Sequence, residues 1–174
     1  MVLTQITMVA IMTMTPVHMR LHHHGLGDIG VVIGLHIAAM YLPSPLTGYL
    51  VDRVGRLAVA GASGAVLLAA GVTAALAPGD ALGPTILALV LLGLGWNLGL
   101  ISGTALVVDA TEPANRSRVQ GSIDVLVALA GATGGVLSGV VVAASGYSTL
   151  ALGGGLLALA LVPALIWAQR TGRD

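Results

Sequence analysis

The chain has 174 residues, of which 56% are hydrophobic and only 8% are charged, and its formal net charge is zero. Because a water-soluble domain averages about 25% charged residues, a soluble fold of this size could not hide so much apolar surface. The solvent must therefore be lipid. Zero net charge excludes a general attraction to nucleic acid, and the absence of cysteine excludes disulfides, thiol nucleophiles and cysteine-ligated metals.

Six apolar segments have the length of a membrane-spanning helix, which needs about 20 mostly apolar residues. They cover about 2–19, 29–51, 57–77, 83–108, 119–144 and 147–168. A barrel strand would have about 10 residues with strict alternation, and these segments show neither property. We therefore predict an all-α membrane protein, a single bundle of six transmembrane helices over residues 1–174.

The first segment carries a polar stripe at helical spacing, formed by Thr4, Thr7, Thr15 and His18. Three histidines follow at 22–24 in the next polar break. His18 and His22 have the i, i+4 spacing of two ligands on one helix face, which zinc or copper could use. Because adjacent histidine side chains point apart and Asp28 is the one carboxylate close by, we predict no metal site.

The second segment carries a similar stripe, formed by His36, Met40, Ser44 and Thr47. Polar groups are costly in hydrocarbon, and the pKa of histidine near neutrality suits proton relay. His36 is therefore a candidate for proton coupling or solute contact. The alternative is a histidine hydrogen-bonded within the helix core.

Residues 48–56 read G-Y-L-V-D-R-V-G-R and form a polar turn between the second and third segments. A carboxylate such as Asp52 can engage the exposed N–H groups and the positive dipole end of a helix. The arginines of this turn also bear on topology. If the helices alternate, one side of the bundle holds Arg53, Arg56, Arg116, Arg118, Arg170 and Arg173, whereas the other holds only Arg20. The positive-inside rule then predicts an inner (plasma) membrane protein with both termini in the cytoplasm.

The fourth segment carries Trp96 and Asn97 near its middle. A buried indole beside an amide suits the wall of a substrate cavity, and the alternative for Asn97 is a bond to a neighbouring helix. The third and sixth segments are almost free of polar side chains. We therefore expect those two helices to lie outside and the other four to line the cavity.

The fifth segment repeats glycine every four residues, at Gly131, Gly135 and Gly139. Such a groove of small residues allows another helix to approach closely. Asp124 lies on the same face and is a candidate to carry a proton or to pair with a cationic substrate. Because it lies six residues after Arg118, a structural ion pair or a role at the helix start is the alternative.

The turn at 48–56 resembles the loop signature G-x-x-x-D-R-x-G-R of the major facilitator superfamily of transporters. The matching residues are Gly48, Asp52, Arg53, Gly55 and Arg56, whereas Leu57 stands where family versions usually carry another basic residue. Residues 109–121, D-A-T-E-P-A-N-R-S-R-V-Q-G, resemble the equivalent inner loop, which includes Arg116 and Arg118. The resemblance implies a charge-and-dipole latch in which Asp52, Arg53 and Arg56 are gating residues and not substrate ligands. The alternative is that the arginines only fix the topology.

The whole pattern resembles the C-terminal six-helix half of a twelve-helix transporter, built as a 3+3 inverted repeat. The resemblance implies half of a secondary active transporter that moves a small organic solute by proton-coupled efflux. A separate or lost N-terminal half, or a second copy of the chain, would complete it in the bilayer, with no cofactor and no nucleic acid. The alternative is a non-transporting accessory or remnant subunit. We do not expect an enzyme, since the H-E-x-x-H motif of intramembrane metalloproteases is absent and no histidine that could serve a serine protease follows His36.

Overall fold

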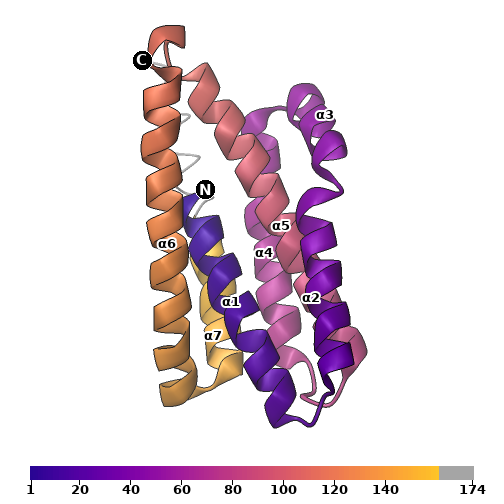
Figure 1. The fold of residues 1–174 in the computed structure, drawn as a ribbon. Helices are drawn as coiled ribbons and strands as arrows, with labels where there is room; N and C mark the ends of the chain where they lie inside the picture. The colour runs from indigo at the N-terminus through magenta and orange to yellow at the C-terminus, as the bar shows by residue number, and fades with distance from the viewer. Residues whose placement is uncertain (161–174) are drawn as a thin grey trace.

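The computed structural model describes residues 1–160, and that part of the chain is helical without a strand (Figure 1). The elements are α1 (Val2–Leu21), α2 (Leu26–Tyr41), α3 (Ser44–Val54), α4 (Arg56–Leu76), α5 (Leu82–Asp109), the short 3-10 turn η1 (Pro113–Asn115), α6 (Arg116–Ser145) and α7 (Tyr147–Leu159). Helices and loops follow the apolar segments and polar breaks of the sequence. The predicted all-α membrane fold is confirmed.

Five stretches of the described chain are apolar and long enough to cross a membrane, and α2 with α3 counts as one of them, Leu26–Val54. The helix predicted at 147–168 begins as α7, an apolar helix of 13 residues up to Leu159. Its remaining predicted residues lie outside the described part of the chain. The sixth crossing therefore stays a prediction.

The span predicted over 29–51 is interrupted at Leu42 and Pro43, although both residues keep right-handed helical backbone angles. Pro43 and Pro45 carry no N–H, so neither can donate to the carbonyl group four residues earlier. A membrane interior offers no water to satisfy these carbonyl groups. The chain consequently leaves α2, turns at Leu42–Pro43 and restarts as α3.

Helices α4, α5 and α7 form the closely packed side of the bundle, held by small residues. A methyl group placed on Gly71 of α4 would lie 2.4 Å from the carbonyl oxygen of Ala151 in α7. One placed on Gly95 of α5 would meet the side chain of Leu67 at 2.8 Å. The Ser63 hydroxyl donates to the Gly95 carbonyl at 2.6 Å. Close backbone approach of this kind is how membrane helices gain packing energy.

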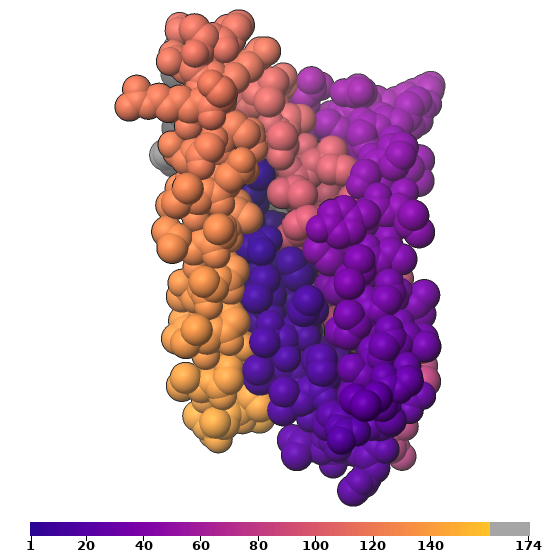
Figure 2. Space-filling model, viewed as in Figure 1, coloured from indigo at the N-terminus to yellow at the C-terminus, as the bar shows by residue number. Residues whose placement is uncertain are grey.

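Helices α2 and α6 lie on either side of a recess, with α1 on its floor beside part of α5 (Figure 2). In Figure 1, α4 and α7 lie behind α1, in contact with each other and away from the recess. These are the two helices that sequence polarity assigned to the outside.

Successive connections lie at opposite ends of the bundle, as the prediction of topology from the arginines assumed. The α3–α4 and α5–α6 connections lie at one end, and the helix ends beside them hold Arg53, Arg56, Arg116 and Arg118 (Figure 1). The α1–α2 and α4–α5 connections meet at the other end, which has Arg20 near it. The structure thus separates an arginine-rich end from an arginine-poor end.

Candidate functional site

The turn between α3 and α4 depends on Gly55. Its backbone has φ 103° and ψ 148°, a conformation that side-chain-bearing residues rarely adopt. The turn is therefore sharp, and α4 starts at the next residue, Arg56. In contrast, a methyl group on Gly48 would meet nothing within 4 Å, so the described chain does not explain that glycine.

Arg56 forms an ion pair at the arginine-rich end of the bundle. Its Nε lies 2.7 Å from Oδ2 of Asp109, the last residue of α5, and both side chains are partly exposed. The Nε–H does not point along this contact, so the pair is electrostatic and not a linear hydrogen bond. It ties the first residue of α4 to the last of α5. Sequence reasoning did not assign a role to Asp109, because nothing in the sequence links positions so far apart.

Asp52 and Arg53 do not share that pair. The Asp52 side chain is exposed and makes no ion pair or hydrogen bond to another residue within 1–160. Arg53 donates to the Tyr49 hydroxyl one turn earlier in α3, and its guanidinium lies near the Tyr49 ring. No helix terminus of the described chain receives the Asp52 carboxylate. The predicted latch thus needs a helix from outside these residues.

The second inner loop brings Arg116 and Arg118 to the same end of the molecule. Both side chains are exposed. Arg116 Nε donates to the Thr111 carbonyl at 3.3 Å and so closes the turn between α5 and α6. Arg118 lies two residues further along α6, with its side chain open to a partner.

His36 is fully buried between α2 and α5. Its Nδ1 donates to the Leu89 carbonyl at 2.8 Å, while Nε2 has no partner among the described residues. Gly93 allows this approach, since a methyl group there would lie 2.5 Å from the His36 carbonyl oxygen. Of the two readings that the sequence left open, this geometry supports the hydrogen-bonded core histidine.

Asn97 fastens α5 to the break in the second span. Its Nδ2 donates to the Met40 carbonyl at 2.7 Å and to the Ser44 hydroxyl at 2.9 Å. Its Oδ1 accepts from the Thr47 hydroxyl at 2.5 Å. Met40 lies in the last turn of α2 and Ser44 and Thr47 in the first turn of α3, so one buried amide bridges the interruption. This geometry supports the second of the two hypotheses for Asn97, a hydrogen bond to a neighbouring helix.

Trp96, the neighbour of Asn97, belongs to a polar cluster at the recess. Its indole N–H donates to Gln5 Oε1 at 2.7 Å, which links α5 to α1. The Tyr41 ring of α2 meets the indole edge-on, with centroids 5.8 Å apart. Sequence reasoning found Trp96 but missed Gln5 and Tyr41. Gln5 is a lone amide in an apolar helix, and that signal was available.

The glycines of α6 face α1 only in part. Gly131 and Gly135 have α1 side chains at 3.0 Å and 3.6 Å from an added methyl group, whereas Gly139 has nothing within 4 Å. Gly134 meets the backbone of α1 itself, since its added methyl group would lie 3.1 Å from the Ile6 carbonyl oxygen. The buried face of α6 therefore runs through Gly131, Gly134 and Ser138.

Asp124 lies two turns before Gly131 on α6, and its side chain is exposed. It accepts a hydrogen bond from Gln120 Nε2 at 3.2 Å and forms no ion pair within residues 1–160. It lies in the third turn of α6, which begins at Arg116, so its position does not support a role at the helix start. Its carboxylate remains open to a proton, a solute or a partner helix.

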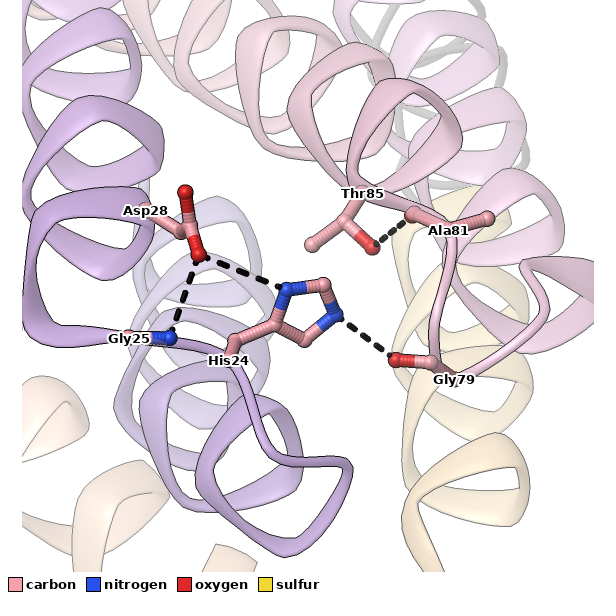
Figure 3. A network of polar contacts seen from close by, with 6 residues as sticks. All are labelled: His24, Gly25, Asp28, Gly79, Ala81 and Thr85. Carbon is pink, nitrogen blue, oxygen red and sulfur yellow. Dashed lines mark hydrogen bonds and ion pairs between the residues drawn. The ribbon is translucent and has the colours of Figure 1, made fainter.

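The loop histidines join two connections at the arginine-poor end (Figure 3). His24 Nε2 lies 3.0 Å from the Gly79 carbonyl oxygen, and its Nδ1 lies 3.9 Å from Oδ2 of Asp28. The same Asp28 oxygen accepts from the Gly25 N–H at 3.1 Å and caps the start of α2. Nearby, the His18 ring stacks on Tyr147 of α7. These contacts hold the loops together.

A mainly apolar cavity of about 340 Å³ lies between α1, α6 and α7, lined by residues such as Ile6, Leu137 and Leu157. Its hydroxyl groups are already used, since Thr7 donates to the Gly154 carbonyl and Ser138 to the Gly135 carbonyl. The cavity therefore offers little to orient a polar solute. The Gln5–Tyr41–Trp96 cluster is the stronger candidate for a solute contact.

Comparisons with known proteins agree with this architecture. The model of the Major Facilitator Superfamily matches residues 1–174. Two relatives from Bacillus subtilis (strain 168), the uncharacterized MFS-type transporters YddS and YdeG, are each 63% identical to the chain; the alignments cover 96% and 97% of it but 38% and 39% of the relatives. The riboflavin transporter RfnT of Brucella anthropi is 36% identical over 91% of the chain and 40% of its own length.

The chain thus spans about two fifths of the length of these relatives. Its apolar helices make it an integral membrane protein. Together with the family match over all of its residues, they show that the chain belongs to the major facilitator superfamily of membrane transporters.

Proposed function

We propose that this chain forms one half of a secondary active transporter, which carries a small organic solute across the plasma membrane. The observation that carries the proposal is the recess between α2 and α6, with a polar aromatic cluster where its helices meet (Figure 2). In this fold the solute binds between two six-helix halves. A second half facing the recess would enclose the Gln5–Tyr41–Trp96 cluster.

The arginine-rich end of the bundle faces the cytoplasm in this proposal, with both chain termini on that side. Asp52 is the gating residue, because its carboxylate is exposed and free to meet a helix end of the other half. Arg56 holds the turn against α5 through Asp109. Breaking the Asp52 contact would open the cytoplasmic side in each transport cycle.

Proton entry drives solute export in this proposal, and Asp124 is the group that carries the proton. Its carboxylate is exposed on α6 and free of ion pairs within residues 1–160. His36 is less suited, because it is buried and bonded to the α5 backbone. The similarity to RfnT makes riboflavin the first solute to test.

The test is transport by proteoliposomes that contain this chain together with an N-terminal half. An imposed proton gradient should drive riboflavin, or another member of a panel of small organic solutes, across the membrane. Vesicles with either half alone serve as the control. Absence of gradient-driven movement of every solute, with both halves inserted, would contradict transport.

A second candidate is a non-transporting accessory or remnant subunit, which the uncovered apolar sides of α2 and α6 also allow. Reversing the charge with Asp52→Arg separates the two. A transporter half should lose alternating access while still inserting into the membrane. A passive subunit should stabilise its partner protein equally well with either residue.

A further inference from the structure

We propose that Gln5, Tyr41 and Trp96 form a recognition site for a flat, uncharged heteroaromatic ring that carries a hydrogen-bond acceptor at its edge. This inference rests on the proposed transport function and adds to it the chemical class of the solute. It is carried by three features of the cluster: the direction of one amide, the exposure of one ring, and the interruption of the helix beside them.

The amide of Gln5 has a defined orientation. Because the indole N–H of Trp96 can only donate, the atom facing it at 2.7 Å must be the Gln5 oxygen. The Gln5 nitrogen then carries two N–H donors, and neither has an acceptor within residues 1–160. An unpaired donor in a membrane protein is costly, so a solute acceptor that meets it gains affinity.

Gly131 leaves room for that amide. A methyl group placed on this glycine would lie 3.0 Å from Gln5 Nε2, which is close contact. Gln5 therefore lies between α5, which holds its oxygen, and α6, which leaves space beside its nitrogen. The donors therefore lie where α1 meets α6, beside Gly131.

Tyr41 supplies the flat surface. Its side chain is 58% exposed although its ring edge contacts the buried Trp96. Offset or edge-to-face contact with a second aromatic system is favourable beyond the area that it buries. An exposed ring held in place by an indole can receive another ring at low entropic cost.

The break after Tyr41 is the third feature. Discontinuous membrane helices form substrate sites in transporters, because their backbone groups are not all used within the helix. Pro45 has no N–H to offer the Tyr41 carbonyl, whereas Asn97 satisfies the adjacent carbonyl of Met40. The Tyr41 carbonyl thus lacks the hydrogen bond that residue 45 would normally donate, and it belongs to the residue that supplies the aromatic surface.

The charge distribution favours an uncharged solute. Apart from Asp124, each Asp, Glu and Arg of the described chain lies in a loop or in the first or last three residues of a helix. The cluster thus contains no cation for a phosphate or carboxylate group. The free energy of desolvating an unpaired charge there would exceed the favourable contacts that the site can offer.

Equilibrium binding to the two-half protein in lipid nanodiscs tests the site, with lumichrome as the flat neutral probe. Flavin mononucleotide supplies a related ring with a charged group, and ribitol a flexible polyol without a ring. We expect lumichrome to bind at least tenfold more tightly than either. Equal binding of lumichrome and flavin mononucleotide would overturn the inference.

Matched variants test the residues. Gln5→Leu should weaken lumichrome binding by about tenfold, the effect of one lost hydrogen bond in a dry site. Asn115→Leu removes an amide from an exposed position of η1, away from the cluster, and should leave the dissociation constant within about twofold. Tyr41→Leu should likewise weaken binding more than Tyr49→Leu. If Gln5→Leu does not fold, Gln5→Met keeps the length and flexibility of the side chain and carries the same expectation.

The two proposals fail in different ways. Lumichrome binding that depends on Gln5, without movement of any solute, would refute transport and leave the recognition site standing. Transport of a charged or non-planar solute that is unaffected by Gln5→Leu would support transport and refute the recognition site. Unchanged lumichrome affinity in Gln5→Leu or Gln5→Met would refute the recognition site directly.

Discussion

The two sides of the bundle differ in how far the described chain completes them. In the most apolar stretch of α5, 56% of the residues are buried, and in that of α4 44% are, against 22% for α6 and 17% for the span formed by α2 and α3. Side chains such as Leu67 and Leu89 are fully enclosed, whereas Val136 and Leu42 are more than two thirds exposed. Both sides are apolar, so hydrophobicity does not distinguish them.

The difference shows where binding energy is still available. Between α4, α5 and α7, glycines such as Gly71, Gly95 and Gly155 are already in close contact with a neighbouring helix. Along α2 and α6, in contrast, many apolar side chains are exposed. The polar contacts of Gln5, Tyr41 and Trp96 lie near these helices. An apolar surface of this kind can be covered by lipid or by the helices of another domain. A carrier can change the contacts on this surface during its cycle while the packed side stays folded.

Gly71→Ala should give the largest effect on stability, because the new methyl group meets the backbone of α7, which cannot move aside. We expect a loss of about 1–3 kcal/mol in unfolding free energy. Reversible unfolding in mixed detergent micelles would measure it. Gly61→Ala in the same helix and Gly139→Ala on α6 are the controls, since nothing lies within 4 Å of either added methyl group. Equal losses in all three variants would remove the contrast between the two sides.

Asn97→Leu should have the next largest effect, because it removes three hydrogen bonds at the break between α2 and α3. The expected cost is about 1–2 kcal/mol, the range for interhelical bonds in membranes. Asn115→Leu makes the same substitution at an exposed loop position without a side-chain cap bond. The same unfolding measurement applies. A cost no greater than that of the control would mean that the amide does not secure the interruption.

Asp109→Asn should have the smallest effect on stability, below about 1 kcal/mol, because the ion pair with Arg56 is partly exposed and screened. Its loss should free the α3–α4 turn, which hydrogen exchange at Gly55 and Arg56 would report. Asp80→Asn at the opposite end is the control. Unchanged exchange in Asp109→Asn would show that the pair does not hold the turn.

The sequence was sufficient for most of the helices and loops within residues 1–160, because hydropathy over about 20 residues identifies membrane spans. It also located the Gly55 turn. Contacts between distant segments could not be predicted, because they depend on how each helix is rotated against its neighbours. Gln5 pairs with a residue 91 positions away, and Arg56 pairs with the last residue of the next helix.

The α6 glycines show the same limit. Their four-residue spacing predicted a groove, but the contact with the α1 backbone falls on Gly134, which lies outside that series. The break after α2 is a different case. Pro43 and Pro45 are evident in the sequence, but hydropathy alone does not reveal an interruption, because an interrupted span is as apolar as a continuous one.

Thiol labelling across the membrane tests the central claim, that the recess faces a solute path and the opposite side faces lipid. The chain has no cysteine, so single cysteines can be placed at will. Tyr41→Cys and Leu156→Cys are matched, because these side chains are 58% and 61% exposed, one at the recess and one on α7. In vesicles containing both halves, a membrane-impermeant thiol reagent should label Tyr41→Cys and spare Leu156→Cys. Labelling of Leu156→Cys alone, or of both at one rate, would contradict the account.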